Sequence, residues 1–141
     1  MQGEDTRNAD RGVGFGEAIG AGFKKYATLS GRSSRSEFWY WTLYYFLCLA
    51  AILAAGTLAG EDLVWIGYVV FALLNFMPSL AVTVRRLHDI DRSGWWYLLI
   101  FVPIIGPFAA ILLIAWFTIR GTVGENRFGP DPLAVRMTEA A

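Results

Sequence analysis

The sequence has little charge for its length. Only 17% of its 141 residues are charged, whereas an ordinary soluble domain carries roughly 25%. Hydrophobic residues make up 55% and aromatic residues 16%, which excludes an intrinsically disordered chain. Twelve basic residues balance twelve acidic ones, so no basic excess points to nucleic acid. The composition indicates a membrane protein, and we expect no nucleic-acid partner.

Cysteine and histidine are nearly absent as well. Cys48 and His88 are the single residues of their kinds. One cysteine excludes an internal disulfide and a cysteine-based metal site, and one histidine excludes the usual zinc ligand sets. A magnesium site built from carboxylates alone stays open. We expect neither a metal ion nor a cofactor.

Charge is missing altogether from three long runs. They hold 23 residues between Glu37 and Glu61, 22 between Asp62 and Arg85, and 27 between Arg92 and Arg120. A helix needs roughly 20 apolar residues to cross a membrane, and a helix of a soluble bundle would keep a polar face. The runs therefore predict an all-α integral membrane protein, a small bundle of three transmembrane helices at about 36–60, 63–87 and 94–119.

The positions of tryptophan, lysine and arginine orient these spans. All six tryptophans lie near an end of a run, as expected for rings at the membrane interface. The segments 1–37 and 85–92 carry lysine or arginine, whereas the Glu61-Asp62 connection carries neither. The positive-inside rule therefore places the N-terminus in the cytoplasm and Glu61-Asp62 outside. Three crossings would place the C-terminus outside, although the tail keeps three arginines.

The third run contains Pro103, Gly106 and Pro107 within five residues. Two prolines so close together interrupt the helical hydrogen bonds twice. We predict a third span kinked at Pro103 and Pro107. The alternative is a re-entrant hairpin that would return the tail to the cytoplasm.

The rest of the chain divides around these spans. Residues 1–12 are polar and predicted to be a disordered extension, and 13–132 form a single membrane domain. Within it, 13–29 has an apolar face at helical spacing and predicts a short amphipathic interfacial helix. Residues 133–141 are predicted to be a flexible tail.

Two spans contain small or polar residues inside their apolar runs. Small residues let helices approach closely in lipid, and span one presents such a set: Ala51, Ala55, Gly56, Ala59 and Gly60. We favour packing within the chain, with the seam of a homo-oligomer as the alternative. In span two, Asn75 and Ser79 lie beside Pro78 and predict an interhelical hydrogen bond next to a kink.

Three polar clusters flank the spans: GRSSRSEFW at 31–39, RRLHDIDRSGWW at 85–96 and GENRFGPDP at 124–132. Together they resemble the small bacterial inner-membrane proteins of domain of unknown function 805, over about residues 15–132. The resemblance implies a multi-pass protein of the bacterial inner membrane. It implies no reaction, because the molecular activity of that family is unassigned.

The clusters suggest what the protein could bind. If span two continues as a helix, Arg85, His88, Asp89 and Arg92 share one face, where Asp89 can pair with either arginine; Glu37 and Asp131 are other acceptors. We favour an interfacial salt-bridge network that ends and anchors the helix, with an anion site as the alternative. Arginine forks bind phosphate, and basic pockets at the cytoplasmic side of spans bind lipid headgroups. The predicted site for anionic lipid or a partner protein comprises Arg32, Arg35, Arg85, Arg86, His88, Asp89, Arg92 and Arg127.

A transporter or channel and an enzyme are the alternatives to this structural or interaction role. A small oligomeric transporter or channel would use the polar middle of span two and the broken third span. No ionisable residue lies inside an apolar run, which argues against a proton or cation path. An enzyme would need His88 and Asp89 as an acid–base pair, but no catalytic motif accompanies them. We therefore expect no enzymatic activity.

Overall fold

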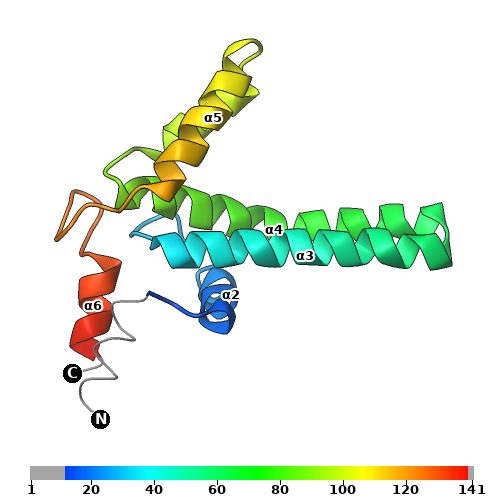
Figure 1. Cartoon of the computed structure of the whole chain (residues 1–141), viewed down its shortest axis with the longest axis horizontal. Coiled ribbons are helices and arrows are strands. Elements are labelled where there is room, and N and C mark those ends of the chain that lie inside the picture. Colours follow the sequence, from blue (N-terminus) through cyan, green and yellow to red (C-terminus); the bar gives the residue numbers. More distant parts are fainter. Residues whose placement is uncertain (1–11, 140–141) are drawn as a thin grey trace.

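The computed structural model describes residues 12–139, so most of the predicted N-terminal extension lies outside the described residues. All the named elements are helical (Figure 1). They are α2 (Phe15–Lys24), α3 (Arg35–Ala59), α4 (Glu61–Asp89), the 3-10 helix η1 (Gly94–Phe101), α5 (Ile105–Thr118) and α6 (Pro132–Glu139). The all-helical fold predicted from the three charge-free runs is confirmed.

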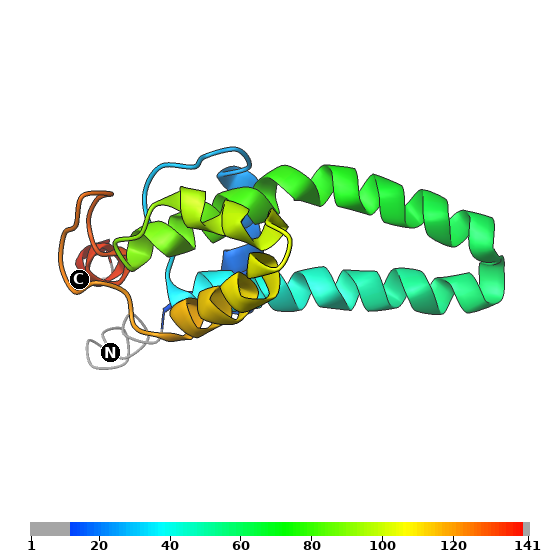
Figure 2. The same ribbon diagram turned by 90° about the horizontal axis from the view of Figure 1, so that it is seen from above.

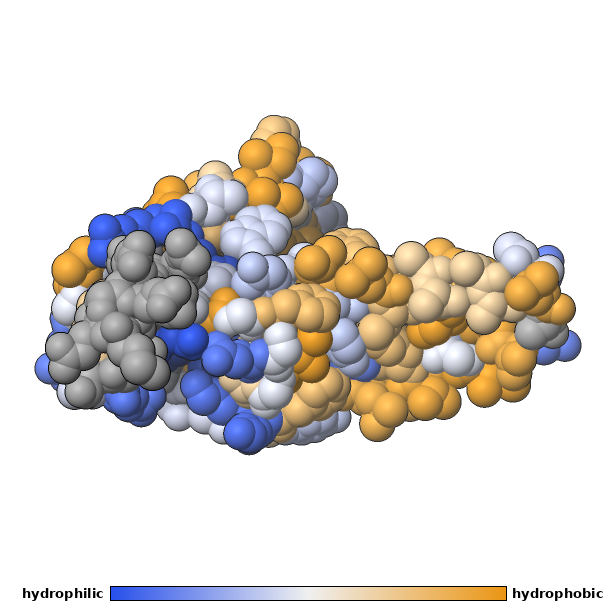
Figure 3. Space-filling model, turned by 60° about the horizontal axis from the view of Figure 1, so that its bottom comes forward, coloured by the Kyte–Doolittle hydropathy of each residue, from blue (hydrophilic) through white to orange (hydrophobic). Residues whose placement is uncertain are grey.

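Helices α3 and α4 form one long antiparallel hairpin (Figures 1 and 2). Their 25 and 29 residues correspond to about 37 Å and about 43 Å of helix, enough for a hydrocarbon core of about 30 Å. Only 6% of the most apolar stretch of α3 and 11% of that of α4 are buried. A core helix of a soluble protein would hide this surface, whereas Figure 3 shows mostly hydrophobic residues along the visible face of the hairpin.

The two ends of α3 have clear local causes. At its start, the Ser34 hydroxyl accepts a hydrogen bond from the backbone N–H of Glu37, at 3.3 Å, as an N-cap residue does. At its end, Gly60 adopts φ +94°, a left-handed conformation that favours glycine. Gly60 therefore forms the turn of the hairpin and is not part of a packing seam.

Gly56 provides the close approach between α3 and α4. A Cβ atom at this position would collide with the Val64 side chain. Ala51 and Ala55 are exposed, and the side chain of Ala59 lies outside the described part. Of these small residues, Gly56 lets α3 and α4 pack closely within the chain, as we predicted in preference to the seam of a homo-oligomer.

The third charge-free run differs from the predicted single kinked helix. It divides into η1 and α5, which pack side by side as a second, shorter hairpin (Figure 2). The reversal lies at Ile104, whose φ of +70° accompanies a tight turn from the Ile105 N–H to the Pro103 carbonyl, at 2.8 Å. With 14 residues, α5 is about 21 Å long and too short to cross a membrane.

Helix α2 lies across the α3–α4 hairpin (Figure 1). Gly22 sits against the ring of Trp41, and the ring of Phe23 packs edge-on against the same ring. After α2, the Tyr26 hydroxyl donates to the Leu74 carbonyl at 2.8 Å. Pro78 has no N–H with which to bind that carbonyl one turn away, so Tyr26 supplies the missing donor.

The C-terminal residues also differ from the prediction of a flexible tail, because Pro132–Glu139 form helix α6. The Asp131 carboxylate accepts a hydrogen bond from the Leu133 N–H at 3.0 Å, which supports the start of the helix. Arg136 reaches Glu17 on α2 at 2.9 Å. This hydrogen bond, together with one from the Gly14 N–H, lowers the pKa of Glu17.

Candidate functional site: a buried charge network

The three polar clusters meet at one end of the α3–α4 hairpin, opposite the Gly60 turn. The backbone N–H of Ser33 donates to the carbonyl of Arg85 at 3.1 Å, and that of Thr122 donates to the carbonyl of Asp89 at 2.8 Å. Three full crossings, as predicted from the sequence, would instead hold the tail on the side of the membrane opposite the other two clusters. Residues 120–131 lie at the same end as both.

Arg32 binds both other clusters. Its guanidinium meets the Asp89 carboxylate at 2.9 Å, and only 1% of its side chain is exposed. The same group donates to the backbone carbonyls of Thr122, Gly124 and Gly129. Because every donor direction ends on a protein acceptor, Arg32 holds the segments together and does not present a charge to a ligand.

Arg86 fastens the end of α5 to the end of α4. It pairs with Asp89 one turn away and donates to the carbonyls of Phe117 and Ile119. Phe117 belongs to the last turn of α5, where carbonyls lack helical partners and a cation is favourable. The Arg86 side chain has no exposed surface, so its pair with Asp89 lies inside the protein.

Arg85 joins α3 to the segment after α2. It pairs with Glu37 at 3.1 Å and donates to the Thr28 carbonyl at 2.7 Å. Glu37 was one of the acceptors considered from the sequence, and this pair is confirmed. The carboxylate of Glu37 thus binds an arginine of α4, whereas its backbone N–H completes the Ser34 cap.

His88 packs against the third cluster. Its ring stacks on Phe128 at 3.9 Å with the planes 3° apart, and its Nδ1 donates to the Gly31 carbonyl at 3.1 Å. The side chain of Asn126 donates to the carbonyl of His88 at 2.9 Å. These contacts use His88 for packing, and they give the acid–base pair with Asp89 no support.

The remaining cations of the predicted site are exposed. Arg127 pairs with Asp91 at 3.1 Å with 60% of its side chain exposed. Arg92 is exposed over the ring of Trp116, at 4.8 Å from its centre, and does not form the predicted pair with Asp89. Arg35 is exposed at the start of α3 and makes one long contact, 3.4 Å, to the Thr118 carbonyl.

Arg120 was not among the residues predicted from the sequence. It lines a small hollow together with Arg35, Ser34 and Asp131. Arg35 also lines a neighbouring open groove of about 350 Å³ with Trp39, Tyr40 and Thr118. The signal for Arg120 was its position as the first charge after the third run, where interfacial cations are common.

The polar residues of span two serve the packing of the helices. Ser79 accepts a hydrogen bond from Trp41 at 3.1 Å, which links α4 to α3. Asn75 is only 3% exposed, and its amide donates to the Phe71 carbonyl of its own helix at 2.9 Å. The predicted interhelical bond of Asn75 is thus replaced by an intrahelical one.

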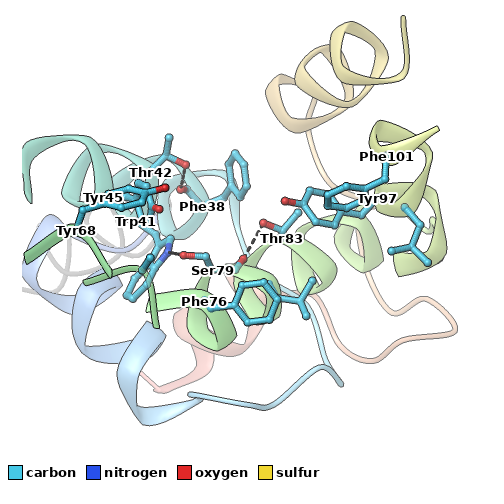
Figure 4. Close-up of a pocket in the computed structure, with 13 residues that line it drawn as sticks. Phe38, Trp41, Thr42, Tyr45, Tyr68, Phe76, Ser79, Thr83, Tyr97 and Phe101 are labelled. Atoms are coloured by element: carbon cyan, nitrogen blue, oxygen red, sulfur yellow. Dashed lines mark hydrogen bonds between the residues drawn. The ribbon is translucent and has the colours of Figure 1, made fainter. Parts of the chain in front are cut away.

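A cleft of about 590 Å³ separates the two hairpins (Figure 4). Residues of α3, α4 and η1 line it, and most are aromatic or carry a hydroxyl group. Trp41, Tyr45 and Tyr68 gather on one side, and Tyr97 and Phe101 lie on the other. Among residues 12–139, no group of three or more His, Cys, Asp or Glu side chains is placed to hold a metal ion.

The family of the chain follows from its similarity to known proteins. Residues 26–130 match the model of a family described as protein of unknown function (DUF805). The chain belongs to this family. That stretch includes all the residues of the buried network, from Arg32 to Gly129.

Several Escherichia coli proteins are similar over most of their length. Inner membrane protein YhaI of strain K12 is 42% identical over 109 residues, covering 77% of this chain and 89% of the relative. Inner membrane protein YhaH is 38% identical, covering 77% and 90%. The uncharacterized protein YiiR is 33% identical, covering 77% and 88%. No solved structure matches the chain.

Proposed function

We propose that this protein resides in the bacterial inner membrane and crosses it twice. Helices α3 and α4 make the crossings, and the η1–α5 hairpin enters the cytoplasmic leaflet and returns. The names of YhaI and YhaH support the location, and the length of α5 supports the hairpin. In this topology the arginines of the tail join the other basic segments in the cytoplasm, as the positive-inside rule favours.

Within this topology the buried arginines have a structural role. Arg32, Arg85 and Arg86 bind carboxylates and backbone carbonyls inside the protein, and the Nε–H of Arg85 is buried without a partner. An incoming phosphate would have to displace these partners and leave them buried without donors, which is costly. The predicted site of eight residues is therefore reduced to its exposed cations, Arg35, Arg92 and Arg127, and the structure adds the exposed Arg120.

Arg35 and Arg120 are the exposed cations that best suit an anionic lipid headgroup. They line one small hollow, which Asp89 and Asp131 also line, so the headgroup would lie outside it. Arg35 borders the neighbouring open groove with Trp39 and Tyr40, aromatic residues of the kind that lie at headgroup level. A guanidinium binds phosphate through paired hydrogen bonds. The function we propose is an interaction role without catalysis, anchored by an anionic phospholipid at Arg35 and Arg120.

Binding of phosphatidylglycerol to the purified full chain in neutral detergent tests this function. The double variant Arg35→Gln, Arg120→Gln should weaken the affinity about tenfold or more, because charged hydrogen bonds contribute about 1.5–3 kcal/mol each. The matched control is Arg127→Gln, which removes an exposed arginine that Asp91 already occupies.

The same titration has outcomes that would contradict the proposal. Equal binding of phosphatidylcholine, or unchanged phosphatidylglycerol affinity in the double variant, would remove Arg35 and Arg120 as a headgroup site. Binding that weakens with added salt in the wild-type protein, and much less in the double variant, would support it.

A further inference from the structure

The cleft between the two hairpins combines aromatic walls with hydroxyl groups that have no assigned use. Its lining includes Phe38, Trp41, Phe76 and Phe101, and none of its residues is acidic or basic at neutral pH. Its volume of about 590 Å³ lies in the range of small-molecule sites. A ligand of this cleft would be uncharged and largely apolar.

The hydroxyl groups of the cleft divide into occupied and free donors. Thr42 donates to the Phe38 carbonyl and Thr83 to the Ser79 carbonyl, both within their own helices. Tyr45, Tyr68 and Tyr97 make no hydrogen bond to another described residue through their hydroxyls, although they come from three different elements. A polar group without a partner in hydrocarbon is unfavourable, so the free hydroxyls favour a ligand with hydrogen-bond acceptors.

The free donors lie on opposite sides of the cleft. Figure 4 shows Tyr45 and Tyr68 on one side, whereas the Tyr97 hydroxyl points inward from η1 toward Thr83. A ligand that uses both sides needs two acceptors on opposite edges. A flat ring with two opposed carbonyl groups meets this requirement, and its faces can lie against the aromatic walls.

The depth of the cleft distinguishes this ligand from an ordinary phospholipid. Tyr45 follows Glu37 by eight residues of α3, or about 12 Å of helix. Phospholipid ester carbonyls lie at the boundary of the hydrocarbon, near the level of Glu37 and Arg85 in the proposed topology. An acceptor that reaches Tyr45 must belong to a molecule that carries carbonyl groups into the hydrocarbon.

We propose that this cleft binds a lipid-soluble quinone. One ring carbonyl accepts a hydrogen bond from Tyr97 and the other accepts from Tyr45 or Tyr68. The prenyl tail leaves past Phe76 and Phe101, which are 65% and 70% exposed on the side open to lipid. The proposal concerns binding alone and is independent of the headgroup site at Arg35 and Arg120.

The test is a titration of the full chain in lipid nanodiscs with a benzoquinone that carries a two-isoprene tail. Trp41 lines the cleft, so quenching of tryptophan fluorescence reports binding. Tyr97→Phe removes the donor on one side of the cleft, and the double variant Tyr45→Phe, Tyr68→Phe removes those on the other, while all the rings are kept. Each variant should raise the Kd about threefold to tenfold, since one hydrogen bond contributes about 0.5–1.5 kcal/mol. Tyr40→Phe is the matched control, because Tyr40 lies on α3 outside the cleft and packs against Phe15.

A second probe gives the outcome that would overturn the proposal. A methylbenzene with the same tail has no carbonyl acceptor and should bind at least tenfold more weakly. Equal affinity of the two probes would show that the cleft takes any apolar chain, such as a phospholipid tail. Loss of quenching as the protein dimerises would show that a second copy fills the cleft, and either result would contradict a quinone site.

Discussion

At the scale of single residues, Asp89 is the carboxylate that pairs with two arginines of the network. Its carboxylate pairs with Arg32 from the segment before α3 and with Arg86 from its own helix, and 5% of its side chain is exposed. Two buried guanidinium groups therefore depend on one counter-charge. Removing one member of a buried ion pair leaves the others uncompensated.

Replacement of Asp89 tests this dependence. Asp89→Asn keeps the shape of the side chain and removes its charge, and it should lower the free energy of unfolding by about 3–5 kcal/mol. Equilibrium unfolding in mixed micelles measures the loss. The matched control is Asp91→Asn, whose pair with Arg127 is about half exposed and should contribute about 1 kcal/mol or less. Equal losses in the two variants would show that the network does not stabilise the fold.

At the scale of elements, the η1–α5 hairpin depends on one glycine. A Cβ atom at Gly106 would collide with the backbone carbonyl of Ile100 in η1. A backbone atom cannot move aside as the end of a side chain can, so the two elements would have to separate. The Gly106 N–H also donates to the Val102 carbonyl at 2.7 Å, which closes the reversal.

Gly106→Ala should therefore loosen the hairpin and lower the free energy of unfolding by about 1–3 kcal/mol, the usual cost of overpacking. The comparison is Gly20→Ala in α2, where a Cβ atom would meet nothing within 4 Å. There the substitution should be neutral or stabilising by up to about 1 kcal/mol, because alanine favours helix. A Gly106→Ala protein as stable as the Gly20→Ala protein would contradict this close packing.

The elements also show what the sequence could predict. The first two charge-free runs located α3 and α4 within about two residues, because the length of an apolar run is a local property of the sequence. The path of the third run could not be predicted from its own sequence, because it depends on contacts with distant residues. It depends on Arg86 finding the carbonyls at the end of α5, and backbone carbonyls have no sequence signature. The three arginines of the tail and the two prolines of the third run were the sequence signals for the re-entrant hairpin that we propose.

At the scale of the whole molecule, the buried network determines which ends of the chain meet. Arg32, Arg85 and Arg86 tie the segment before α3, the end of α4 and the end of α5 into one unit. Figure 3 shows hydrophilic surface at this end and hydrophobic surface along the hairpin that projects from it. In the topology we propose, such a protein has an even number of crossings, with its N-terminal and C-terminal segments on one side.

The most direct test of this account is the side of the membrane on which α6 lies. In a Cys48→Ala background, Thr138→Cys places a thiol on α6 and Glu61→Cys places one at the hairpin turn, both at exposed positions. A membrane-impermeant maleimide applied to cells with an intact inner membrane should label position 61 and leave position 138 unlabelled until the membrane is opened. Labelling of position 138 in intact cells would contradict the re-entrant hairpin and the single cytoplasmic network.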